Sequence, residues 1–103
     1  MNSRKNFNKA LDQFSIDAAS LMAEAFIANE NGNIDTEVFG KISEEYDTVL
    51  DAYDAYKDGS ITCDEFGDIL AISTLHLSRF TNNVHGNSMY DLFYEFYFSN
   101  IKK

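Results

Sequence analysis

The chain has 103 residues, of which 45% are hydrophobic and 15% aromatic, and its net charge at neutral pH is −9. This length suits one domain with one modest core, and the hydrophobic fraction is too high for a disordered acidic tail. The charge argues against nucleic acid and anionic membranes as direct ligands, because both are polyanions that the chain repels.

Apolar residues recur at intervals of three and four, which predicts helices rather than strands. The pattern predicts four helices, over residues 7–25, 39–53, 66–80 and 89–101. Residues 82–87 are predicted to form a loop, and Ser88 is the predicted N-cap of the fourth helix. Because short connections favour antiparallel neighbours, we predict an all-α fold: a single-domain up-down bundle of four helices over residues 1–103.

Residues 26–42 resemble residues 53–69, and each copy has the pattern of a helix end, a tight turn and a helix start. Gly32 and Gly59 suit the left-handed residue that ends many helices. Asp35 and Thr62 suit the N-caps of the helices that follow, and Thr62 with Glu65 has the sequence of a capping box. The two copies predict two similar glycine-turn corners in the bundle.

The second corner is similar to the calcium loop of an EF-hand, over the twelve residues 54–65. The matching positions are Asp54, Asp58, Gly59, Ile61 and Glu65. Tyr56 stands where a third oxygen ligand belongs, and the first copy has Ile27 and Val38 where the terminal carboxylates belong. A degenerate EF-hand-like calcium-binding protein is therefore one hypothesis, and helix caps around a glycine turn explain the same residues without a metal.

The acidic residues gather in one segment. Eleven of the 17 lie between Asp35 and Asp68, where only Lys41 and Lys57 are basic, so the segment has a net charge of 11 − 2 = −9. Five carboxylates at intervals of three and four along the second helix define what we call the acidic line: Glu44, Asp47, Asp51, Asp54 and Asp58. Like charges at these intervals destabilise a helix, whereas a surface that serves only solubility usually mixes both signs. The acidic line is the predicted partner-binding site, and a merely solvated face is the alternative.

Aromatic residues cover more than half the circumference of the predicted fourth helix. One packed face needs a narrower stripe, and aromatic residues are enriched at interface cores. We therefore predict that this helix contacts a second copy of the chain, as a homodimer, or the target protein. The predicted interface residues are Tyr90, Phe93, Tyr94, Tyr97 and Phe98. The alternative is a central helix whose tyrosine hydroxyls reach water.

The sequence offers no catalytic pairing, glycine-rich phosphate loop or histidine pair with metal-ligand spacing. We therefore predict a protein that is not an enzyme, with no catalytic, cofactor-binding or metal-binding residues. The single cysteine, Cys63, excludes an intrachain disulfide. It favours a cytoplasmic location, which is the cytoplasm of the host cell if the protein is phage-encoded. No apolar stretch approaches the roughly 18 residues of a membrane span.

Charge confined to one face favours a basic partner. Our first hypothesis is an acidic binding protein that inhibits a basic nucleic-acid-binding protein by charge mimicry, its carboxylates competing for the cations that hold phosphates. In size, acidity and lack of catalytic motifs the chain is similar to phage-encoded anti-CRISPR and anti-restriction inhibitors. The alternative is an immunity protein or antitoxin for a basic nuclease toxin, which needs the same electrostatics.

Overall fold

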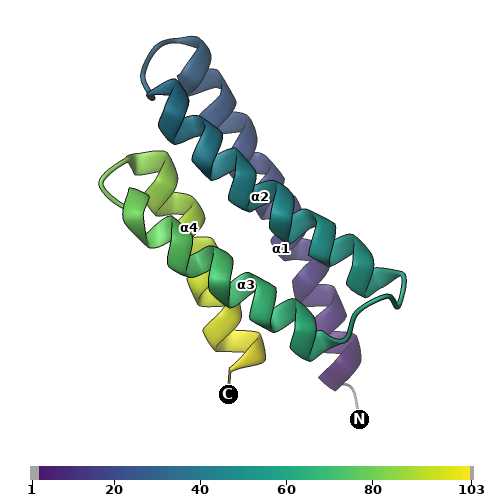
Figure 1. The fold of residues 1–103 in the computed structure, drawn as a ribbon. Helices are drawn as coiled ribbons and strands as arrows, with labels where there is room; N and C mark the ends of the chain where they lie inside the picture. Colours follow the sequence, from purple (N-terminus) through teal and green to yellow (C-terminus); the bar gives the residue numbers. More distant parts are fainter. Residues whose placement is uncertain (1–2, 103) are drawn as a thin grey trace.

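The computed structural model describes residues 3–102 and is helical almost throughout, with no strand in this part of the chain (Figure 1). Its elements are α1 Ser3–Glu30, α2 Thr36–Lys57, α3 Cys63–Leu77, the short 3-10 helix η1 Ser78–Phe80, α4 Val84–Phe96 and the π-helical turn η2 Tyr97–Ile101. The predicted all-α class is confirmed, and the four α-helices pack together around one core.

The molecule is elongated, with extents of 47 × 22 × 20 Å, and the start of α1 and the end of η2 lie at the same end (Figure 1). Helix α2 packs mainly on α3, and α1 packs on both α2 and α4. At 28 and 22 residues, α1 and α2 are the longest helices, and their connection extends beyond the α3–α4 pair (Figure 1).

The core lies where the apolar stripes of the four helices meet. Phe14 of α1 contacts two rings of α4, with ring centroids 5.4 Å from Phe93 and 4.7 Å from Phe96. Further fully buried side chains come from all four helices: Leu11, Ile42, Val49, Phe66, Leu70, Leu77 and Met89. Each large apolar side chain buried in this way contributes roughly 1.5–3 kcal/mol. This burial is what positions α2 with its polar face outward.

The caps decide where α2 and α3 begin. The side chain of Asp35 accepts a hydrogen bond from the backbone N–H of residue 37, at 2.7 Å. Thr62 and Glu65 form the capping box, at 3.1 and 2.8 Å, so both predicted N-caps are confirmed. Gly32 and Gly59 precede these caps with φ of 78° and 86°, a left-handed conformation that glycine adopts without steric cost.

Helix α4 begins at Val84, earlier than predicted, so the predicted loop over residues 82–87 is wrong for its last four residues, 84–87. Its N-cap is Asn83, whose side chain accepts from the backbone N–H groups of residues 85 and 86, at 2.9 and 3.1 Å. Ser88, the predicted cap, instead donates its hydroxyl to the carbonyl of Val84 inside the helix. Gly86 is required by packing, because a Cβ there would lie 2.3 Å from the carbonyl oxygen of Phe80.

Candidate partner-binding site

All five residues of the acidic line are exposed. Glu44, Asp47, Asp51 and Asp54 lie within α2, and Asp58 is its C-cap. Side chains three and four residues apart on a helix are neighbours, roughly 5–6 Å apart. At about 1.5 Å rise per residue, the line from Glu44 to Asp58 is roughly 21 Å long.

The two lysines of the acidic segment do not neutralise the line. Lys57 is held by α1: its Nζ lies 2.9 Å from Oδ1 of Asp12, which also accepts a hydrogen bond from the Tyr53 hydroxyl at 2.7 Å. The hydrogen bond from Lys57 lowers the pKa of Asp12 and raises that of Lys57 itself. Lys41 forms no ion pair within residues 3–102. Among residues 5–102, whose side chains the structure describes, the first four carboxylates of the line have no hydrogen-bond or ion-pair partner.

The carboxylate at the end of the line belongs to the turn. Asp58 accepts hydrogen bonds from the hydroxyl and the backbone N–H of Ser60, and these bonds lower the pKa of Asp58, so it carries its charge over a wider pH range. Glu65 accepts from the backbone N–H of Thr62. The would-be calcium ligands Asp58 and Glu65 are thus hydrogen-bonded within the corner. Among the residues described, no group of three or more His, Cys, Asp or Glu side chains is arranged to hold a metal ion.

A groove of about 470 Å³ lies between α2 and α3, at the start of the acidic line. Helix α2 lines it with Glu44, Glu45 and Thr48, and α3 lines it with Ile69, Ile72, Ser73 and His76. The side chain of Glu45 is only 13% exposed, and its Oε2 lies 3.1 Å from Nδ1 of His76. Sequence reasoning missed this groove, because its two walls are far apart in the chain and Glu45 is not a member of the acidic line.

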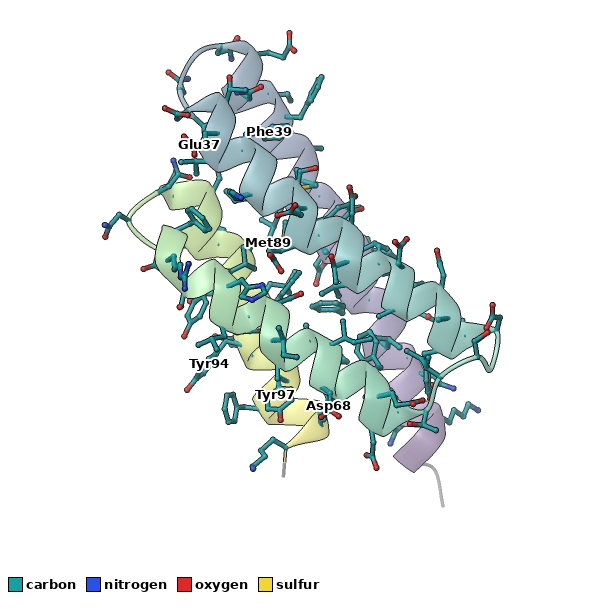
Figure 2. The ribbon with its side chains drawn as sticks, viewed as in Figure 1. Glu37, Phe39, Asp68, Met89, Tyr94 and Tyr97 are labelled. Carbon is teal, nitrogen blue, oxygen red and sulfur yellow. The ribbon has the colours of Figure 1, made fainter. Side chains whose placement is uncertain are left out.

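The five residues of the predicted aromatic interface differ in exposure. Tyr94 and Phe98 are 44% and 49% exposed, with ring centroids 4.6 Å apart, and Tyr90 and Tyr97 are half-buried. Phe93 is fully buried, so its place in that interface is wrong: its ring packs against α1 in the core. Figure 2 shows Tyr94 on the side of the α3–α4 pair that is turned away from α2.

A second apolar hollow, of about 220 Å³, lies beside these aromatic rings, between α3 and the α4–η2 segment. Leu75, which lines this hollow, is 68% exposed. The buried face of α3 consists of positions 66, 67, 70, 73, 74 and 77. The exposed apolar surface is therefore shared by α3, α4 and η2.

Comparison with protein-family models, characterised proteins and solved structures gave no match to this chain. Over residues 3–102, no helix combines the length and the hydrophobicity needed to cross a bilayer.

Proposed function

We propose that this protein is not an enzyme and that it inhibits a basic nucleic-acid-binding protein by charge mimicry, in the style of phage anti-CRISPR and anti-restriction inhibitors. The observation that supports the proposal is the exposed acidic line on α2 together with the capture of Lys57 by Asp12. That contact holds the amino group of Lys57 against α1, where it pairs with Asp12 and with none of the line's carboxylates. Because Lys57 pairs with Asp12 on α1, it does not neutralise the carboxylates of the line, and this helix face presents negative charge to the solvent.

The mechanism is competition. The partner's lysine and arginine side chains, which otherwise hold phosphates, form ion pairs with the carboxylates of the line. Charge-assisted hydrogen bonds of this kind are among the stronger hydrogen bonds. The field of the whole segment steers the encounter, so association slows as salt rises; the screening length falls to about 10 Å at 0.1 M ionic strength. The inhibitor then occupies the partner's cationic nucleic-acid-binding surface without being a substrate.

The test compares two variants of equal net charge. The line variant carries Glu44→Gln, Asp47→Asn, Asp51→Asn and Asp54→Asn. The control variant removes four exposed carboxylates on other helices, through Asp17→Asn, Glu24→Gln, Glu30→Gln and Asp91→Asn. Each protein is immobilised and used to capture proteins from a host lysate, and nucleic-acid binding by the captured protein is then measured by fluorescence anisotropy with and without inhibitor.

We expect the original chain and the control variant to capture a basic nucleic-acid-binding protein and to block its binding, and the line variant to do neither. Equal inhibition by the line variant contradicts the proposal, because the line then contributes nothing. The identity of the captured protein also tests the alternative. A basic nuclease toxin encoded beside this chain identifies an immunity protein or antitoxin, whereas a host-defence nuclease or effector identifies an inhibitor.

Two further features belong to this proposal: an up-down order of the helices with two similar glycine corners, and a pairing of two copies through Tyr94 and Phe98. The charge distribution supports the pairing. Residues 69–103 contain three basic and two acidic residues, 3 − 2 = +1, so the side of the molecule formed by this segment, which includes Tyr94 and Phe98, carries none of the net negative charge. Two copies repel each other least when they meet on that side, and both acidic lines then stay accessible.

A further inference from the structure

We propose that the groove between α2 and α3 is the receptor for one arginine side chain of the basic partner. This inference rests on the proposed function and adds the partner residue and its contact point. The groove borders Glu44, so it is continuous with the acidic line, and its other wall presents two isoleucines, Ile69 and Ile72, beside Ser73 and His76. A site with a carboxylate on one side and aliphatic carbon on the other matches a side chain that is cationic at its tip and apolar along its stem.

The apolar wall comes from α3. Ile72 is 55% exposed and Ile69 is half-buried, and both line the groove opposite Glu44. The methylene groups of an arginine laid across these two isoleucines lose contact with water, which is favourable at roughly 25 cal/mol per Å² of apolar surface. A surface that bound its partner by charge alone would gain nothing from these two isoleucines.

Ser73 supplies an independent observation about the groove. The residue is only 1% exposed and lines the groove. Its hydroxyl makes no hydrogen bond to any of residues 5–102, whose side chains the structure describes. In this range, every side-chain oxygen without a hydrogen-bond partner keeps some contact with solvent. The hydroxyl therefore keeps its small accessible area at the groove. A donor or acceptor that enters the groove can therefore form a hydrogen bond with this hydroxyl.

Arginine fits this combination better than lysine. Its planar guanidinium carries five N–H donors in a fixed fork, so one group can donate to Glu44 on one wall and to the Ser73 hydroxyl on the other. The chain's own cations leave Glu44 available: His76 pairs with Glu45 instead, and Lys41 makes no ion pair within the described residues. The weaker hydration of a guanidinium also lowers the cost of entering a half-apolar groove.

The probe is the capped tripeptide acetyl-Ala-Arg-Ala-amide, titrated into the isotope-labelled full chain and followed by two-dimensional amide NMR, with the lysine tripeptide alongside. We expect saturable shifts centred on Thr48, Ile72 and Ser73, and at least about threefold weaker binding of the lysine peptide. Glu44→Gln, an exposed change that leaves the fold intact, should weaken the arginine peptide at least about fivefold. Ser73→Ala should weaken it about twofold or more. Asp58→Asn, at the far end of the line with the same charge change, should alter it less than about twofold.

Three outcomes overturn the inference: shifts spread evenly along α2 as far as Asp58, equal binding of the two peptides, or unchanged affinity in both Glu44→Gln and Ser73→Ala. The two proposals fail separately. If the arginine peptide binds diffusely while the four-residue line variant still loses its captured partner, only the groove is wrong. If the peptide binds in the groove while that variant keeps its partner and its inhibition, only the proposed function is wrong.

Discussion

The acidic line should cost the protein stability, and Asp51→Asn measures that cost. Asp51 has Asp47 four residues before it and Asp54 three residues after it, and none of these carboxylates has an ion-pair partner among the described side chains of residues 5–102. Each like-charge pair at such spacing destabilises a helix by about 0.2–0.5 kcal/mol. Removing both pairs should therefore stabilise the fold by about 0.4–1.0 kcal/mol, which raises Tm by about 2–8 °C in a domain of this size.

The assay is thermal unfolding, followed by circular dichroism at 0.01 M and at 1 M salt. At 1 M the screening length is about 3 Å, shorter than the separation of these carboxylates, so the gain should disappear there. Asp17→Asn is the matched control, because it changes the net charge equally but residues 13, 14, 20 and 21 carry no charge. Its hydrogen bond from Gln13 can also be kept by an asparagine oxygen. An equal gain in both variants, or none in Asp51→Asn at low salt, would refute the reasoning.

Three more predictions follow from single contacts. Gly86→Ala should destabilise the fold by about 1–3 kcal/mol, because its Cβ meets a backbone carbonyl, whereas Gly40→Ala, with open space around it, should stabilise the fold by about 0.5–1 kcal/mol. Urea unfolding of the two variants measures the difference, and equal stability of the two contradicts the packing argument. The pKa of Asp12 is lowered in the folded state, so its contact with Lys57 stabilises the fold at pH values above the usual pKa of 3.8, and this stabilisation is lost as the pH falls through the lowered pKa. The difference in unfolding free energy between the original chain and Asp12→Asn should therefore shrink at acidic pH. A difference that does not depend on pH would count against the contact. Sedimentation at micromolar concentration should show a dimer that Phe98→Asp converts to a monomer, and a monomeric original chain ends the pairing hypothesis.

The elements were predictable because their signals are local. Apolar spacing over four to eight residues located all four helices, and the caps Asp35 and Thr62 each act within three residues. The start of α4 was not predictable in this way. Its cap, Asn83, lies in a polar stretch with several equivalent candidates, and the choice depends on the close approach of Gly86 to Phe80, a contact between η1 and α4 that no spacing rule reveals.

The sequence by itself determined that the charge is confined to residues 35–68 and that five carboxylates share one helix face, because a helix places side chains by their spacing alone. Only the tertiary structure decided what surrounds that face. It placed Asp12 against Lys57, paired Glu45 with His76, and put Ile72 and Ser73 opposite Glu44. It also drew Phe93 into the core while leaving Phe98 outside. These outcomes join residues from different helices, and they follow from how whole apolar faces pack together, which the order of residues within one helix does not specify.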